Sequence, residues 1–189
     1  TIGYTINKKI TGNYSDITTN SFYASHIING AGTGGMVCFN DFSLYQRAKL
    51  LRGWGRSSAH FNESESIEKR FKVKISGMDY DAKYIFTEMG YNFLPSEISA
   101  AFALEQIKKL NNNIKIRNKN FDKLKKFFGS FDNMFYLPEQ YKGVKTPWLA
   151  FPLVIKENNI FKRKEMQIFF ERHNIQTRTI FTGNILKQP

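Results

Sequence analysis

The stretch that decides the fold reads S-F-Y-A-S-H-I-I-N-G-A-G-T-G-G-M-V and runs from Ser21 to Val37. The residues from Asp16 to Tyr23 are rich in β-branched side chains, partly alternate, and predict a strand that leads to His26. The glycine cluster at 30–35 predicts a tight connection, and the apolar run from Met36 to Phe39 predicts a short buried strand. His26 is therefore expected where a strand meets a glycine-rich connection.

Capping residues and apolar spacing predict two helices in the rest of the chain. Asp41 is a suitable N-cap for a helix that continues through Arg52. Pro95 opens the longest helical pattern, at a favourable first position, and apolar residues recur at helical spacing as far as Gly129. The remaining expected elements are a strand over 1–10 with a turn at Asn7 and Lys8, a polar irregular segment over 55–80, strands at 84–86, 134–137 and 148–155, a helix over 163–173 and a strand over 176–181.

Charge and composition narrow the classes of function. The chain has 189 residues, 41% of them hydrophobic, and a formal net charge of +12. Such a length suits one or two domains with a sizeable core. The basic residues are mostly scattered lysines, not a stripe of arginines and aromatic residues, so the excess charge favours a solvated surface that attracts an anionic substrate. A basic nucleic-acid-binding domain remains the rival from another class of function.

Cys38 is the single cysteine of the chain. A single cysteine excludes a disulfide within the chain and any four-cysteine metal site. The apolar residues around Cys38 predict a buried, inert thiol. No apolar stretch approaches the roughly 18 residues that a membrane-spanning helix needs, and no signal-peptide pattern follows Thr1. A cytoplasmic protein without membrane contact is expected.

The quoted stretch resembles the cofactor-lysine segment of the DegT-type, vitamin B6-dependent nucleotide-sugar aminotransferases, which reads roughly S-F-[YF]-x-x-K followed by G-x-G-G. Ser21 and the glycines at 32, 34 and 35 match in register, whereas His26 stands in place of the lysine. In that family, histidine at this point marks a branch of sugar 3-dehydratases, which remove a hydroxyl group. An imidazole cannot hold pyridoxal phosphate covalently, but it transfers protons near neutral pH. Taken alone, the histidine would be an ordinary core or surface residue.

The resemblance also implies cofactor-binding residues. Ser21 matches the serine that binds the cofactor phosphate; a serine that hydrogen-bonds nearby backbone is the alternative. G-Y-N-F-L-P-S-E-I-S-A-A-F, from Gly90 to Phe102, is similar to a family block whose asparagine reaches the phosphate held by the neighbouring subunit. Asn92 therefore implies a homodimer with a shared active site, although a turn before a helix would equally suit it. Leu94 departs from the family's arginine or methionine, so no role carries over to it.

Two further segments resemble the sugar 3-dehydratases specifically, namely R-G-W-G-R from Arg52 to Arg56 and G-N-I-L-K-Q-P from Gly183 to Pro189. In one branch the first precedes cysteines that hold an iron–sulfur cluster, but here S-S-A-H-F-N-E-S-E-S follows. No cluster and no other metal is expected, and His60 within this stretch is interpreted as an exposed residue. By resemblance, Arg178 and Asn184 approach the active site and contact sugar or phosphate; a surface ion pair is the alternative for Arg178.

The expected fold is α/β. Residues 1–130 would form the C-terminal part of an aspartate-aminotransferase-type large domain, including a long bridging helix, and 131–189 part of a small α+β domain. The resemblance covers the middle and later part of the family's sequence. The chain is therefore expected to be an internal fragment, inactive alone because the aspartate that pairs with the cofactor's pyridine nitrogen lies upstream in the family.

For the intact protein the resemblance implies a pyridoxamine-phosphate-dependent 3-dehydratase. Its substrate would be a nucleotide-linked 4-keto-6-deoxyhexose, its product class 3,6-dideoxysugars for surface polysaccharide, and glutamate would restore the cofactor amine. A second rival keeps the family but not the reaction: an aminotransferase relative without dehydratase activity, or a binding subunit, in which His26 is a remnant.

Overall fold

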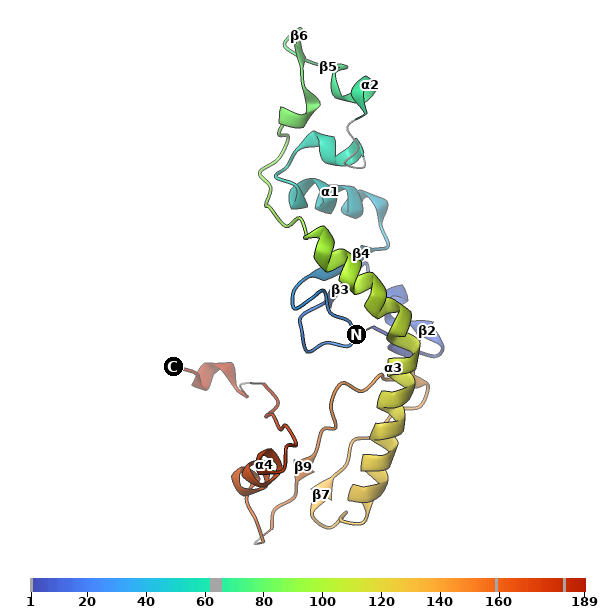
Figure 1. Ribbon diagram of the computed structural model, residues 1–189, viewed down its shortest axis with the longest axis vertical. Coiled ribbons are helices and arrows are strands. Elements are labelled where there is room, and N and C mark those ends of the chain that lie inside the picture. Colours follow the sequence, from blue (N-terminus) through green and yellow to red (C-terminus); the bar gives the residue numbers. More distant parts are fainter. Residues whose placement is uncertain (1, 62–65, 159, 182) are drawn as a thin grey trace. The chain divides into compact units, whose positions relative to one another are not determined.

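The computed structural model describes residues 2–61, 66–158, 160–181 and 183–189 (Figure 1). It is a mixed α/β structure with two compact units. Unit 1 comprises Thr1–Asn118 and Gln140–Leu149, and unit 2 comprises Lys119–Glu139 and Ala150–Pro189. The expected domain division after residue 130 stays a prediction.

The first element of unit 1 is a three-stranded sheet in the order β2-β1-β8. Its strands are β1 (Thr5–Ile6), β2 (Lys9–Ile10) and β8 (Val144–Lys145), and β1 is antiparallel to both neighbours. Asn7 and Lys8 both have positive φ, 48° and 67°, as a two-residue hairpin turn requires. The turn predicted at these two residues is confirmed.

A second hairpin carries the stretch that decides the fold. Strand β3 (Ile17–Ser21) is antiparallel to β4 (Gly35–Phe39), and Ser21 lies opposite Gly35. Both strands were expected, but the predicted burial of β4 is wrong, because Cys38 is exposed. The reason is that β3 and β4 form a sheet of two strands only, and every residue of β4 except Phe39 is exposed.

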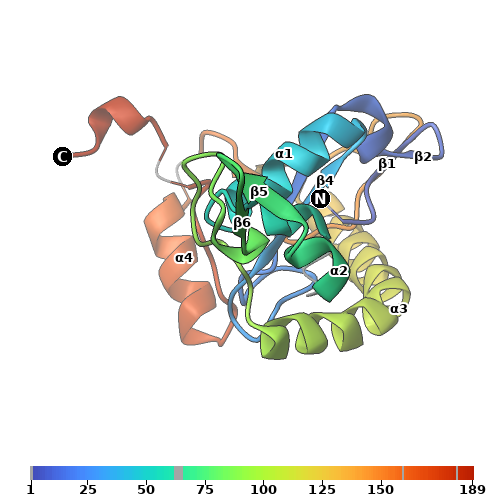
Figure 2. The ribbon, with the colours of Figure 1, turned by 90° about the horizontal axis from the view of Figure 1, so that it is seen from above.

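Helix α1 (Phe42–Arg52) follows β4 and lies beside it (Figure 1 and Figure 2). The Asp41 carboxylate accepts a hydrogen bond from the Leu44 N–H at 2.8 Å and another from the Ser43 hydroxyl. The Ser43 bond first, and then the Leu44 bond, lower the pKa of Asp41 below its ordinary value. The predicted N-cap and both predicted ends of this helix are confirmed.

The segment that follows α1 contains regular structure, contrary to the irregular segment predicted there. Its hairpin turns at Ser76 and Gly77, with φ of 51° and 81°. The predicted strand over 84–86 is also wrong, because Tyr84 ends a short helix and Phe86 makes only an isolated bridge with Arg56. The elements are η2 (Ser57–Phe61), α2 (Ile67–Arg70), β5 (Val73–Ile75), β6 (Met78–Tyr80) and η3 (Ala82–Tyr84).

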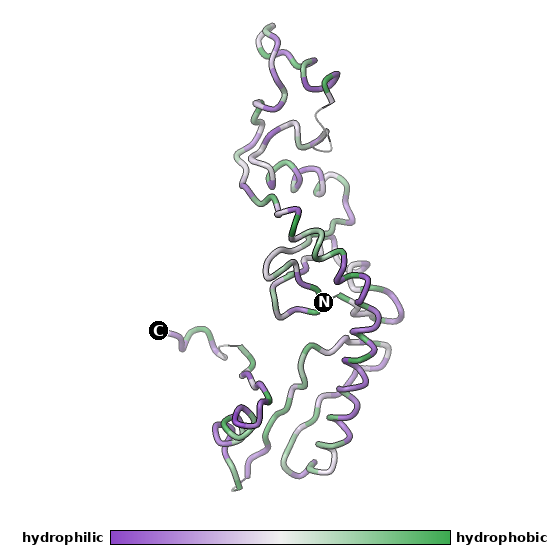
Figure 3. Tube along the Cα trace, viewed as in Figure 1, coloured by the Kyte–Doolittle hydropathy of each residue, from purple (hydrophilic) through white to green (hydrophobic). Residues whose placement is uncertain are grey.

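Helix α3 (Glu97–Gly129) is the longest element; it begins in unit 1 and ends in unit 2. Figure 3 shows hydrophilic and hydrophobic residues interspersed along it. Ala103 and Phe121 are buried, whereas Ile98 and Leu104 are 79% and 61% exposed. The predicted end of this helix at Gly129 is confirmed, whereas the predicted start at Pro95 is wrong, because the helix begins two residues later at Glu97.

Unit 2 packs around aromatic rings. Strand β7 (Phe135–Tyr136) is antiparallel to β9 (Val154–Ile155), and α4 (Arg163–Arg172) and the short η4 (Ile185–Lys187) follow. No strand forms over 176–181, where one was predicted, since no other strand pairs with this segment in the described part of the chain. The stacked and tilted rings belong to Phe121, Phe128, Phe135, Phe151 and Phe161.

Candidate functional site

His26 lies in the loop between β3 and β4 and is exposed. Its backbone N–H donates to the Tyr23 carbonyl at 2.9 Å, and its ring meets the Tyr23 ring edge-on with centroids 6.4 Å apart. The next two residues, Ile27 and Ile28, are only 8% and 2% exposed. These apolar side chains anchor the loop in unit 1, so the imidazole is presented to solvent from a fixed backbone.

Ser21 is the last residue of β3, at the start of the same loop. Its Oγ accepts a hydrogen bond from the Tyr23 N–H at 3.2 Å. Tyr23 thus contacts both Ser21 and His26, and brings the two predicted site residues into one loop. Because Oγ acts as an acceptor here, its own proton can be donated to a phosphate oxygen, so the hydroxyl fits the phosphate of the implied cofactor.

Asn92 belongs to a different part of unit 1 and is exposed. It lies just before α3, and its neighbours are hydrogen-bonded to the end of α1. The Tyr91 N–H donates to the Leu51 carbonyl at 2.7 Å, and the Phe93 N–H donates to the Arg52 carbonyl at 3.0 Å. The G-Y-N segment and the R-G-W-G-R segment, predicted as separate motifs, therefore form one backbone unit. The glycines in both motifs are the sequence signal that could have indicated this close approach.

Arg178 and Asn184, the two residues predicted to contact substrate, both belong to unit 2. The Asn184 side chain accepts from the Leu186 N–H at 3.0 Å and so caps η4. Arg178 is exposed, and its charge helps to lower the pKa of Glu171, although the Thr177 N–H and hydroxyl contribute more. Their contact with substrate stays a prediction.

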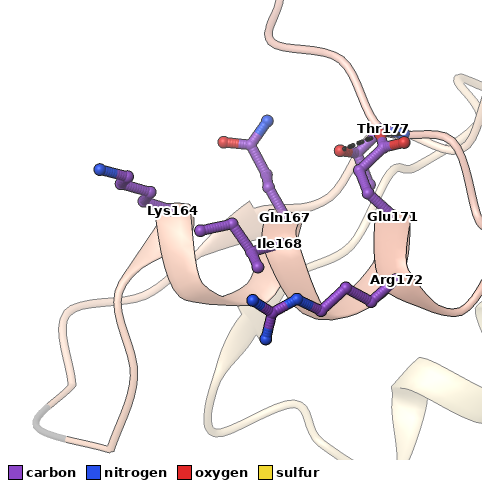
Figure 4. Close-up of a pocket in the computed structure, with 6 residues that line it drawn as sticks. All are labelled: Lys164, Gln167, Ile168, Glu171, Arg172 and Thr177. Atoms are coloured by element: carbon purple, nitrogen blue, oxygen red, sulfur yellow. Dashed lines mark hydrogen bonds between the residues drawn. The ribbon is translucent and has the colours of Figure 1, made fainter.

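A shallow pocket of about 560 Å³ lies on α4 and includes none of the predicted site residues. Figure 4 shows the side chains of α4 that line it, together with Thr177 from the segment that follows the helix. Its only carboxylate, that of Glu171, accepts hydrogen bonds from the Thr177 N–H and hydroxyl. This carboxylate is therefore satisfied within the chain. The lining residues are Lys164, Gln167, Ile168, Glu171, Arg172 and Thr177.

The other two histidines have local partners. His60 is exposed and its Nδ1 lies 2.7 Å from Gln46 Oε1. His173 caps the end of α4, with Nδ1 2.7 Å from the Phe169 carbonyl oxygen. Among the described residues no group of three or more histidine, cysteine or acidic side chains is placed to hold a metal ion. None of the helices in the described part is long and apolar enough to cross a membrane.

An exposed histidine and a phosphate-competent serine on one strand-to-strand loop, within a mixed α/β structure, are compatible with an enzyme that binds a phosphorylated cofactor. The model of the DegT/DnrJ/EryC1/StrS aminotransferase family matches residues 1–189. The chain belongs to this family. The predicted family relationship is thereby confirmed.

Two curated relatives are identical to this chain at just under a third of the aligned positions. The lipopolysaccharide biosynthesis protein RfbH of Salmonella typhimurium is 31% identical over 191 residues, which cover 100% of this chain and 44% of RfbH. The GDP-4-keto-6-deoxy-D-mannose 3-dehydratase of Yersinia pseudotuberculosis is 32% identical over 98% of this chain and 45% of its own length. The chain thus spans less than half the length of these relatives.

Solved structures of 3-dehydratases also match this chain. The Escherichia coli GDP-4-keto-6-deoxy-D-mannose-3-dehydratase with bound hydrated pyridoxal phosphate matches with a TM-score of 0.76 and 30% identity, over 98% of this chain and 46% of that one. Another structure of such a dehydratase, a histidine-to-asparagine variant with bound GDP-perosamine, also matches with a TM-score of 0.76, at 28% identity. A third holds a trapped adduct of pyridoxal phosphate and glutamate, with a TM-score of 0.71 and 30% identity.

Proposed function

We propose that the intact protein is a pyridoxamine-phosphate-dependent 3-dehydratase that acts on a nucleotide-linked 4-keto-6-deoxyhexose. The observation that carries the proposal is His26, exposed on an anchored loop at the position where the family has its cofactor lysine. The curated 3-dehydratases among the relatives support the same reaction class. The proposed fold is part of an aspartate-aminotransferase-type large domain followed by part of a small domain.

In this proposal each residue has a separate task. The cofactor, when bound, supplies an electron sink that allows the bond between C3 and its hydroxyl to break. Ser21 donates its hydroxyl proton to the cofactor phosphate, and Asn92 reaches the phosphate held by the second subunit of a homodimer. The His26 imidazole accepts and returns the proton that this elimination requires. A lysine at this position would instead attach the cofactor covalently, which favours exchange of an amine over loss of a hydroxyl.

Product and amine donor follow from the same proposal. Loss of the C3 hydroxyl leads toward a 3,6-dideoxysugar, a building block of surface polysaccharide. Glutamate is the proposed donor that restores the pyridoxamine form. Support comes from the relatives, one of which is a lipopolysaccharide biosynthesis protein and another of which trapped a glutamate adduct of the cofactor.

The absence of a covalent link between His26 and the cofactor gives a direct test. The full-length protein is incubated with pyridoxal phosphate, reduced with borohydride and digested. No reduced cofactor should be found on the peptide from Ser21 to Val37, because imidazole forms no stable bond of this kind. A His26→Lys variant is the positive control and should acquire the adduct. An adduct on the wild-type peptide would contradict the proposal.

The role of His26 in proton transfer is tested with His26→Asn. Dehydration should fall by at least ~100-fold, the usual scale of a lost general base, while cofactor affinity changes little. His60→Asn is the matched control, because His60 is also exposed and its Nδ1 is hydrogen-bonded to Gln46, away from the predicted site residues. Near-normal dehydration by His26→Asn would remove His26 from the mechanism.

A further inference from the structure

We infer that Gly55 and Gly90 are positioning residues for Asn92: their backbones pack against each other and fix the asparagine on the end of α1. The inference rests on the proposed function, in which Asn92 serves the cofactor of the second subunit. It assigns a role to the R-G-W-G-R segment that the proposed chemistry leaves unused. We call the place where the backbones of 51–57 and 85–93 meet the glycine junction.

Hydrogen bonds line the glycine junction on both sides of the two glycines. On the Asn92 side, the Trp54 N–H donates to the Tyr91 carbonyl at 2.8 Å. On the other side, the Thr87 N–H donates to the Gly55 carbonyl at 2.9 Å, and the Ser57 N–H donates to the Ile85 carbonyl at 3.0 Å. Together with the two bonds from Tyr91 and Phe93 to the end of α1, these bonds hold the segment against the R-G-W-G-R turn along its whole length.

The two glycines allow this approach because neither has a side chain. A Cβ at Gly90 would lie closer than 3.0 Å to the backbone of both Trp54 and Gly55, a separation that real Cβ atoms essentially never show. A Cβ at Gly55 would meet the Glu88 carbonyl equally closely. Gly55 also has φ of +74°, which L side chains rarely adopt. Any side chain at either position must therefore push the two segments apart.

Such a displacement reaches Asn92 directly. Gly90 lies two residues before Asn92, and Asn92 itself forms an isolated bridge with Gly53. The Asn92 side chain is exposed, so the backbone fixes the position of its Cα and thereby the region that its amide can reach. A shift of about 1 Å at a group that must meet a phosphate is enough to lower a rate by about 100-fold.

Separate anchors hold both sides of the glycine junction. The Arg56 guanidinium stacks on the Trp54 ring, 4.5 Å from its centroid, and lies 5.4 Å from the Phe86 ring centroid. Arg47 of α1 forms an ion pair with Glu88 at 3.0 Å. The segment before Asn92 is thus tied to α1 and to the R-G-W-G-R turn, which is the arrangement expected of a support for an exposed contact residue.

The test uses full-length protein and heterodimers made by subunit exchange. Gly90→Ala is combined with His26→Asn in one pairing and with Asn92→Ala in another. If Gly90 acts through Asn92, the first pairing leaves one site with both functional residues intact and restores dehydration, whereas the second leaves none. In the Gly90→Ala homodimer, the dissociation constant for pyridoxal phosphate, measured by absorbance titration, should rise at least about 10-fold. The displaced segments should also lower the unfolding temperature, while the dimer still assembles.

Two glycines in open space provide matched controls. Gly129→Ala matches Gly90→Ala, since neither position has positive φ and nothing lies within 4 Å of a Cβ at Gly129. Gly77→Ala matches Gly55→Ala, because Gly77 has φ of +81° but no neighbour within 4 Å. Both controls should leave cofactor affinity unchanged. If Gly90→Ala does not assemble, Gly55→Ala takes its place in the same pairings.

The outcomes separate this inference from the proposed function. Failure of His26→Asn to complement Asn92→Ala, despite proven heterodimers, would overturn the shared site itself. Complementation in that pairing, but not between His26→Asn and Gly90→Ala, would overturn only the positioning role. Failure of both glycine variants to assemble would assign the junction to folding and would also overturn it.

Discussion

At the scale of single residues, the loop between β3 and β4 brings together what the sequence could only place in order. Ser21 and His26 are five positions apart, and Tyr23 contacts both, the first through its N–H and the second through its carbonyl and ring. The periodicity and the glycine cluster predicted the strands and the connection. They could not predict this arrangement, because it depends on the hydrogen bonds of one turn.

Ser21 gives the first prediction at this scale. Ser21→Ala should raise the dissociation constant for pyridoxal phosphate by about 10- to 100-fold, because a hydrogen bond to a charged group contributes about 1.5–3 kcal/mol. The unfolding temperature should change little, since the hydrogen bond that Ser21 Oγ accepts from the Tyr23 N–H is exposed to solvent. Ser25→Ala, in the same loop, is the control. Equal effects of the two substitutions on cofactor affinity would contradict a specific phosphate contact.

At the scale of elements, the ends of helices could be predicted from the sequence, whereas strand burial and short exposed strands could not. Asp41 and Gly129 marked the ends of α1 and α3 because caps are local and readable. Cys38 was assigned to a buried strand because an apolar run usually has cover on both faces. The strand exists, but its burial depends on neighbours far away in sequence, which a local pattern does not contain. The hairpin β5–β6 was missed because its strands are short and largely exposed.

The segment around that hairpin should lose stability in acid in a defined way. Arg70 Nε donates to Asp81 Oδ1 at 2.7 Å and is the main cause of the lowered pKa of Asp81. A carboxyl group with a lowered pKa in the folded state stabilises that state above its unfolded pKa, near 4, and loses this contribution as the pH falls through the folded pKa. Asp81→Asn should therefore unfold at a lower temperature than wild type at pH 7, and the difference should shrink as the pH falls from about 4 through the lowered pKa of Asp81.

Asp79→Asn is the control for this prediction. Asp79 pairs with Lys74 at 3.5 Å, but both side chains are largely exposed, 78% and 66%, so the pair should contribute little. Hydrogen exchange over 73–80 locates the change. Equal losses from the two substitutions at pH 7, or a difference for Asp81→Asn that persists undiminished at pH 2, would show that the Arg70 pair does not stabilise this segment.

At the scale of the whole molecule, burial was the least predictable property. The apolar spacing of α3 correctly indicated a long helix, yet Ile98 and Leu104 on it are largely exposed, and nothing in the described part of the chain covers them. Helices of this kind derive most of their stability from packing of an apolar face. Because the chain spans less than half the length of its relatives, the cover of such faces cannot be deduced from these residues.

The redox chemistry of the intact protein provides the last prediction. An iron–sulfur cluster is usually held by four cysteine thiolates, or by two together with two histidines, and these 189 residues supply only Cys38. Where one branch of the dehydratases keeps its cysteines, this chain has Ser57, Ser58 and further serines, which are poor ligands for iron. Full-length protein purified without air should contain no stoichiometric iron or sulfide, and glutamate should slowly restore its pyridoxamine form. A dithionite-bleached absorbance band with matching iron and sulfide would contradict this prediction. It would also require cysteines from outside the segment, which the mass spectrum of the alkylated protein would identify.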